Sequence, residues 1–362
     1  MSIDSLCKRW LKGHDAGLAV LVIQNGKVLH KQGYGFARVD DELAPDAGTI
    51  FDLASCSKHF TATAIMMLAE RGKLGYDDPL TRYFPFPAYA EAITVRHLLH
   101  HTGGLKDYFE LYEQDGDETS RWGDDERPSS ADIVGALAQE PEPAFAAGER
   151  FDYSNSGYVV LAEIVSKASG KPFPRFLREE AFKPLGMTRT RVNDGSGKRD
   201  DNQAQGYEEG EPFFVTPLDD AYGDGAVQTT LDDLVRWNAA MDTNKLVSKK
   251  TQAEAWKSGK LADGEETGYG FGWFVDGKGD ALSVNHEGSY GGFTTYYSKE
   301  IGEGLAVIVL ANFDDAEPDK LADSILESLG EDDDEDEDED DEDEDEDDDE
   351  EKDEDEEPED DE

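Results

Sequence analysis

Hydrophobic and polar positions along the chain predict strands near both ends and helices between them. Residues 18–24 and 27–34 are two β-rich runs joined by Asn25-Gly26, a dipeptide that readily adopts the two positive φ angles of a tight hairpin. Strand-like runs return at residues 271–275, 281–286, 292–298 and 305–311. The chain therefore opens and closes with segments that favour an antiparallel sheet.

A helix is predicted over residues 55–71, because apolar side chains such as Phe60, Ala64 and Leu68 recur at helical spacing and Gly72 suits the left-handed end of a helix. Thr230, with Asp233 three residues later, is typical of a helix start. The other predicted helices cover residues 94–100, 130–139, 156–169, 173–182, 231–241 and about 318–329.

Together these elements predict an α/β (α+β) fold, with a central antiparallel sheet flanked by helices and a mostly α-helical insertion. Residues 1–330 are long enough to form one large domain. Its sheet lobe is expected at about 1–76 and 218–330, and its helical lobe at about 77–217.

The last 32 residues, 331–362, contain 30 of the 85 acidic residues of the chain. They have no apolar pattern, so we expect a disordered, solvated tail. The alternative is that the tail binds a basic partner or divalent cations. The preceding 330 residues are acidic as well, with 55 acidic residues against 33 Lys and Arg.

This negative charge disfavours binding to nucleic acid or to anionic membranes. Residues 1–12 lack the apolar core of a secretion signal, and no later segment is apolar over a membrane-spanning length. Two cysteines, Cys7 and Cys56, are too few for a disulfide scaffold. A cytoplasmic protein is expected; the alternative is an exported protein whose numbering begins at its mature terminus.

One short pattern carries nucleophilic chemistry. In Ser55-Cys56-Ser57-Lys58, residues three apart share a helix face, which places an amine beside a hydroxyl. A serine needs such a neighbouring base to become a nucleophile. A second Ser-x-x-Lys, from Ser5 to Lys8, lies in a polar terminal segment with no strand before it. We interpret it as a chance occurrence.

The segment from Thr49 to Ala62, which includes Ser55 and Lys58, resembles the region around the nucleophile of class C β-lactamases and their relatives, which include penicillin-binding proteins, D-alanyl-D-alanine carboxypeptidases, D-aminopeptidases and esterases. Leu98 to Leu105 and Gly148 to Tyr158 are similar to further segments of this family. The resemblance covers about residues 18–329, and it implies a β-lactamase/transpeptidase-like fold and hydrolysis through an acyl-enzyme.

The resemblance also implies roles for individual residues. Tyr153 and Asn155 match the Tyr-x-Asn motif, in which the tyrosine is the proposed base and the asparagine binds the substrate and the lysine. The third motif of the family falls at His286-Glu287-Gly288. In such enzymes the oxyanion hole is formed by two backbone N–H groups, here those of Ser55 and Ser289.

The third motif departs from the usual pattern. Glu287 stands where the family has Thr or Ser, and a glutamate facing the pocket would repel a substrate carboxylate. His286, in place of Lys, also favours the esterase and aminopeptidase branches. We therefore expect a serine hydrolase of small esters or amides, including D-amino acid peptides. The alternatives are a β-lactamase or D-Ala-D-Ala carboxypeptidase, and an inactive member that acts as a binding or scaffold protein.

Other features of the sequence have simpler interpretations. His97, His100 and His101 imitate a metal cluster, but no glutamate accompanies them as the general base of a zinc hydrolase, so no metal is expected. No cofactor motif is present, so no cofactor is expected. Without a Gly-x-Ser-x-Gly elbow, the chain does not match an α/β-hydrolase. Cys56 is expected to pack between helix and sheet.

Overall fold

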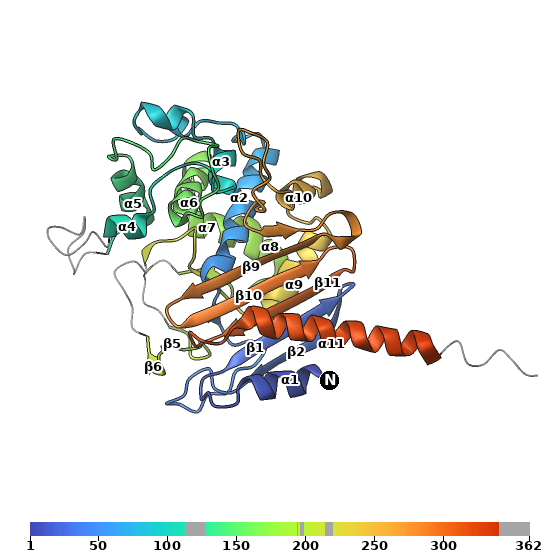
Figure 1. The fold of residues 1–362 in the computed structure, drawn as a ribbon. Helices are drawn as coiled ribbons and strands as arrows, with labels where there is room; N and C mark the ends of the chain where they lie inside the picture. The colour runs from blue at the N-terminus through green and yellow to red at the C-terminus, as the bar shows by residue number, and fades with distance from the viewer. Residues whose placement is uncertain (113–126, 194, 196–198, 214–219, 340–362) are drawn as a thin grey trace, which may run out of the picture.

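The computed structural model describes residues 1–112, 127–193, 195, 199–213 and 220–339. At its centre is a six-stranded antiparallel sheet in the order β2-β1-β11-β10-β9-β8 (Figure 1). The two ends of the chain thus meet in β1 and β11, which confirms the predicted central antiparallel sheet. The strands are β1 (Leu18–Gln24), β2 (Lys27–Tyr34), β8 (Phe274–Asp276), β9 (Ser283–Tyr290), β10 (Phe293–Glu300) and β11 (Leu305–Ala311).

The bounds of β1, β2 and β11 coincide with the predicted runs. Asn25 and Gly26 have φ angles of 49° and 78°, as the hairpin turn requires. β8 begins three residues later than predicted. The reason is Gly272, which has a φ of +78° and passes so close to α2 that a Cβ there would lie 2.7 Å from the Cα of His59. This stretch therefore packs on a helix before the strand starts.

Helices α1 (Ile3–Trp10) and α11 (Pro318–Glu339) cover one face of the sheet (Figure 1). Alternate strand positions such as Val20 and Val309 are buried there against Leu6, Leu321 and Ile325 from the two helices. α1 was not predicted, since its composition is polar. Its apolar residues nevertheless follow helical spacing, which was the available signal: Ile3, Leu6, Cys7 and Trp10.

α11 continues ten residues past its predicted end at residue 329. It therefore enters the stretch predicted to be disordered, in keeping with the low cost of extending a helix that packing has already nucleated. Residues 340–362 of the predicted disordered tail lie outside the described residues. No helix in the described part of the chain is both long and apolar enough to span a membrane.

The opposite face of the sheet is covered by α2 (Lys58–Glu70) and α9 (Leu231–Asp242). α9 is capped as predicted, because the side chain of Thr230 accepts a hydrogen bond from the backbone N–H of Asp233. The remaining α-helices are α3 (Val95–Leu99), α4 (Tyr108–Tyr112), α5 (Ser130–Leu137), α6 (Asn155–Ser169), α7 (Phe173–Leu177), α8 (Lys183–Leu185) and α10 (Lys249–Ala255). Short strands form two small sheets, β3 (Phe51–Asp52) with β7 (Val227–Thr229) and β4 (Arg191–Val192), and β5 (Tyr207–Glu208) with β6 (Glu211–Pro212).

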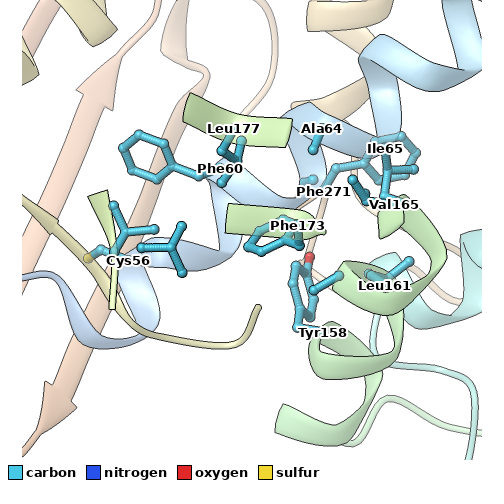
Figure 2. Close-up of a cluster of buried hydrophobic side chains, with 14 of the residues drawn as sticks. Cys56, Phe60, Ala64, Ile65, Tyr158, Leu161, Val165, Phe173, Leu177 and Phe271 are labelled. Atoms are coloured by element: carbon cyan, nitrogen blue, oxygen red, sulfur yellow. The ribbon is translucent and has the colours of Figure 1, made fainter. Parts of the chain in front are cut away.

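α2 joins the sheet to these helices. Figure 2 shows Phe60 and Ile65 of α2 among side chains of α6 and α7, including Tyr158, Leu161 and Phe173. All five are fully buried or nearly so. Because one continuous core spans the sheet and the helices, residues at the start of α2 and of α6 are held in fixed relative positions.

Candidate active site

Ser55 lies in a tight turn between a strand and a helix. β3 ends at Asp52, a 3-10 turn covers Ala54–Ser57, and α2 begins at Lys58, so the helix predicted from residue 55 starts with a tighter turn. Ala54 has a φ of 45°, an uncommon conformation for a residue with a Cβ, and its N–H donates to Asp52 Oδ1 at 2.8 Å. The turn leaves Ser55 partly exposed at the junction.

Lys58 is completely buried beside Ser55. Its Nζ lies 3.0 Å from Ser55 Oγ, 2.9 Å from Asn155 Oδ1 and 2.8 Å from the backbone oxygen of Asp224. The last two groups are acceptors, so they hold two N–H bonds of the amine. The remaining N–H of the amine points to Ser55 Oγ, so the lysine and the hydroxyl are in direct contact. The predicted proximity of hydroxyl and amine is therefore present.

Asn155 is the first residue of α6 and reaches the site from the helical part of the fold. Ser154, the residue before the helix, makes no capping bond with its side chain. Instead, the carboxylate of Asp107 accepts a hydrogen bond of 2.7 Å from the Asn155 N–H. This contact satisfies a helix N-terminus and fixes the residue that contacts Lys58.

Tyr153 lies beside the same lysine. Lys58 Nζ is 4.8 Å from the centre of the Tyr153 ring. The other side of Tyr153 packs on His101, with ring centres 4.4 Å apart, and His101 Nδ1 accepts from the N–H of Ser154 at 3.0 Å. Burial holds the pKa of His101 well below its usual value, so the imidazole is a neutral support for this segment.

Ser289 lies on the β9 edge that faces away from β10. The carbonyl of Leu282 accepts from Ile301 on the β10 side. N–H and C=O directions alternate along a strand, so the N–H of Ser289 points to the opposite edge. β8 covers that edge only as far as Asn285. In the turn that carries Ser55, the N–H of the next residue, Cys56, donates to the carbonyl of Leu53. The N–H groups of Ser55 and Ser289, the two predicted oxyanion donors, therefore lie outside the regular hydrogen bonds of the turn and of the sheet.

Gly288 sets the distance between β9 and the turn that carries Ser55. A Cβ at this position would lie 2.4 Å from the oxygen of Leu53 and 2.4 Å from Thr295 Oγ1. Thr295 Oγ1 itself donates to Leu53 at 2.9 Å. Only a residue without a side chain allows the strand to approach this closely.

We expect Gly288→Ala to lower the free energy of unfolding by about 2 kcal/mol or more, because the methyl group must push the turn away from β9. Gly135→Ala is the matched control. Gly135 is exposed in α5 with no neighbour within 4 Å of its Cβ position, so alanine there is expected to raise stability by about 0.5–1 kcal/mol. Urea unfolding checks both values; equal effects of the two substitutions would contradict the packing at Gly288.

His286 and Glu287 point to opposite faces of β9. His286 is buried, with its ring nitrogens 2.9 Å from the hydroxyl of Tyr269 and 2.6 Å from the backbone oxygen of Glu287. Its ring centre lies 6.0 Å from that of Tyr153, so it stands behind Tyr153 and does not line the pocket described below. A direct substrate contact of His286 stays a prediction.

The sequence-based argument that Glu287 faces the pocket is wrong. Its side chain is exposed on the α11 side, opposite Tyr296 in the β9–β10 register. Partial burial of the carboxyl, and then the negative charge of Asp319 on α11, raise the pKa of Glu287. Alternation along the strand is the physical reason, since neighbours of an inward histidine point outward.

Burial, and then the positive charge of Lys58, lower the pKa of His286 to about 3. The unfolded chain takes up a proton on this histidine below pH 6.5, whereas the folded chain does so only near pH 3. Stability from this group is therefore complete above pH 6.5 and is lost as the pH falls towards 3.

We expect the unfolding free energy of the wild type to fall more steeply than that of His286→Gln between pH 5.5 and 4, by at most about 1.4 kcal/mol per pH unit. Urea titrations at several pH values measure both slopes. The other titrating groups are shared by the two proteins, so parallel curves would contradict a buried, neutral His286.

A pocket of about 150 Å³ opens at Ser55. Of the predicted site residues, Ser55, Asn155 and Ser289 line it. The sequence did not single out its other polar or aromatic walls, which come from distant segments without a shared local pattern: Asp52, Tyr108, Phe109, Asn193, Asp224 and Tyr290. Asp52 lies within the segment from Thr49 to Ala62 that resembles the family, and this was an available signal.

Cys56 is structural, as expected. Its thiol is buried and donates to the carbonyl of His286 at 3.0 Å, and burial raises its pKa to about 12. Such a thiol stays protonated, which argues against a nucleophilic cysteine. The other Ser-x-x-Lys pattern lies in α1, where the exposed Lys8 pairs with Asp4. It forms no site with Ser5 comparable to Lys58 with Ser55.

The three neighbouring histidines turn to different partners. His97 Nδ1 accepts from the N–H of Thr94, and His100 Nδ1 contacts the carbonyl of Tyr269, while His101 supports Tyr153. Within the described ranges, no group of three or more His, Cys, Asp or Glu side chains is arranged to hold a metal.

Ser55 lies at a strand-to-helix turn, contacts a buried lysine and faces the edge of an antiparallel sheet. This arrangement defines a serine hydrolase of the Ser-x-x-Lys class. The model of the Beta-lactamase family matches residues 6–330. The chain belongs to the Beta-lactamase family and is a serine hydrolase of that family.

Several relatives agree. Penicillin-binding protein 4* of Bacillus subtilis is 34% identical over 316 residues, which cover 83% of this chain and 68% of that protein. Protein flp of Staphylococcus aureus is 27% identical over 337 residues, or 89% of this chain and 65% of that protein. The chain thus spans about two thirds of the length of these relatives. The structure of a penicillin-binding protein from Bacillus halodurans is similar, with a TM-score of 0.76, 25% identity, and coverage of 91% of this chain and 100% of that one.

Proposed function

We propose that this chain hydrolyses small esters or amides, including D-amino acid peptides, through an acyl-enzyme on Ser55. The 3.0 Å contact between Lys58 Nζ and Ser55 Oγ carries the proposal. In the proposed reaction, the serine oxygen attacks the substrate carbonyl and its proton passes to Lys58 and Tyr153. The N–H groups of Ser55 and Ser289 stabilise the oxyanion, and the leaving group departs with a proton from the same pair.

Deacylation reverses these roles. Water attacks the acyl ester and gives its proton to the pair formed by Lys58 and Tyr153. Ser55 regains its own proton from this pair as the acid is released. Asn155 orients Lys58 through both steps. The buried position of Lys58 excludes competing solvent contacts from the amine, which favours proton exchange with the serine.

The charge of the pocket supports esters or amides without a carboxylate next to the scissile bond. Two lining residues are acidic, Asp52 and Asp224, and none of the lining residues that the structure describes is Lys, Arg or His. Glu287 was expected to disfavour substrates with a carboxylate. Asp52 and Asp224 now support the same preference. A substrate carboxylate would meet like charge in this pocket.

A second candidate is reaction with penicillins or D-Ala-D-Ala peptides, which is favoured by the 34% identity to a penicillin-binding protein. Steady-state hydrolysis of p-nitrophenyl acetate, D-alanine p-nitroanilide and benzylpenicillin separates the candidates. We expect turnover of the first two and slow or absent turnover of the third. Penicillin hydrolysis faster than that of both others would instead support the second candidate, and no turnover of any would contradict the proposal.

A further inference from the structure

Asp224 places a carboxylate in the wall of the pocket that contains Ser55. Its backbone oxygen accepts a hydrogen bond from Lys58 Nζ, the atom that also contacts Ser55 Oγ. The next residue, Gly225, packs beside the Ser55 turn, since a Cβ on it would lie 3.8 Å from the oxygen of Ala54. The carboxylate therefore belongs to a segment directly adjacent to the reactive hydroxyl.

The side chain of Asp224 is well ordered by its surroundings. The hydroxyl of Tyr108 donates to Asp224 Oδ2 at 2.9 Å, and both residues are buried, with Asp224 only 8% exposed. A carboxylate has about four acceptor positions, so one phenol leaves most of them open. The orientation is thus fixed while hydrogen-bonding capacity remains.

The positive charge of Lys58 partly stabilises the Asp224 carboxylate, but burial outweighs it. Asp224 makes no ion pair within the described part of the chain, although Lys58 is near enough to influence it electrostatically. Lys58 itself directs its amine to Ser55, Asn155 and the Asp224 backbone oxygen. A buried carboxylate without a salt bridge is costly, and burial raises the pKa of Asp224 despite the nearby charge of Lys58. A cation that enters the pocket would relieve this cost.

We propose that Asp224 recognises a positively charged amine on the acyl part of the substrate, which makes amino acid esters and amides with a free α-amino group the preferred class. This inference rests on the proposed function, because it assigns specificity to the same pocket. An α-ammonium lies two bonds from the carbonyl carbon that Ser55 attacks, so both groups must be recognised by adjacent residues. Asp224 and Ser55 satisfy that condition.

The other carboxylate of the pocket is a weaker candidate. Asp52 Oδ1 accepts from the N–H of Ala54 at 2.8 Å, and Oδ2 faces the amide of Gln228 at 3.4 Å. These contacts tie Asp52 to the conformation of the turn before Ser55. In the described part of the chain, the Asp224 side chain accepts a hydrogen bond from the Tyr108 phenol and is not tied to the turn before Ser55, so it is the residue assigned to the amine.

Binding to Ser55→Ala variants tests the inference without turnover. Calorimetry compares alaninamide, as either enantiomer, with propionamide, which has the same skeleton without the amine. In Ser55→Ala, the better alaninamide enantiomer is expected to bind at least tenfold more tightly than propionamide. Adding Asp224→Asn should reduce this ratio about tenfold. Adding Glu287→Gln, which removes an equal charge outside the pocket, should leave the ratio unchanged.

Equal binding of the two amides would overturn the inference, as would a ratio that survives Asp224→Asn. A ratio abolished by Asp52→Asn but kept in Asp224→Asn would also overturn it. Failure of the proposed function is measured separately. In that case the wild type shows no Ser55-dependent hydrolysis of either alanine p-nitroanilide or the p-nitroanilide of propionic acid. The binding ratio is measured whether or not that hydrolysis occurs.

Discussion

Replacing Ser55 by Ala is expected to reduce hydrolysis of a short acyl ester by about 10⁴-fold or more. No covalent ester can form without the hydroxyl, and only binding and oxyanion stabilisation remain to assist water. The substitution removes the hydroxyl of a partly exposed residue near the start of a turn, so the fold should be retained. Initial rates with p-nitrophenyl acetate measure the effect, and circular dichroism checks the fold.

Ser5→Ala is the matched control for this substitution. Ser5 belongs to the other Ser-x-x-Lys pattern of the chain, in α1 on the far face of the sheet. It should keep the wild-type rate. Equal rates for wild type and Ser55→Ala would show that the hydrolysis does not use this serine.

Replacing Lys58 by Met is expected to reduce the same rate by about 10³-fold, within the usual range for loss of a positioned proton acceptor. Methionine fills a similar volume, so the loss would reflect the missing amine rather than a cavity. Lys8→Met is the control, because Lys8 is exposed and pairs with Asp4. Single-turnover measurements follow acylation directly.

A second readout separates chemistry from damage to the site. Without the amine, Asn155 Oδ1 and the Asp224 backbone oxygen lose a donor, which costs about 1–3 kcal/mol for each group left unpaired. Burial of an uncharged side chain offsets part of that loss. If Lys58→Met acylates at the wild-type rate while remaining folded, Lys58 has no part in activating Ser55.

Local chemistry explains why some elements were predictable from sequence. The Asn25-Gly26 turn sets the pairing of Gln24 with Lys27 next to it in the first hairpin, and the uninterrupted apolar run from residue 305 to 311 is typical of a buried central strand. In contrast, the start of β8 depends on the close approach of Gly272 to α2, which involves residues more than two hundred positions apart. No local pattern reports such a contact.

The candidate site divides in the same way. Ser55 and Lys58 are three residues apart, so helix geometry alone predicts that they meet. Tyr153, Asn155 and Ser289 depended on the family resemblance, because they approach Ser55 only through the packing of α6 and β9. The outward direction of Glu287 needed the actual strand register.

Asp224 and Tyr108 show what sequence analysis misses when neither resemblance nor spacing assigns a role. They are more than one hundred residues apart, and their hydrogen bond exists only because the start of α4 and the loop before β7 meet at the same pocket. Burial and charge balance can be judged only once that pocket is known. The specificity of the site is therefore a property of its tertiary structure.

Peptide mapping after reaction with a fluorophosphonate probe tests the central claim most directly. The account predicts a single phosphonylated residue, Ser55, and no labelling of Ser55→Ala. Labelling of any other serine, or an unlabelled Ser55 in a protein that still hydrolyses the ester, would contradict it.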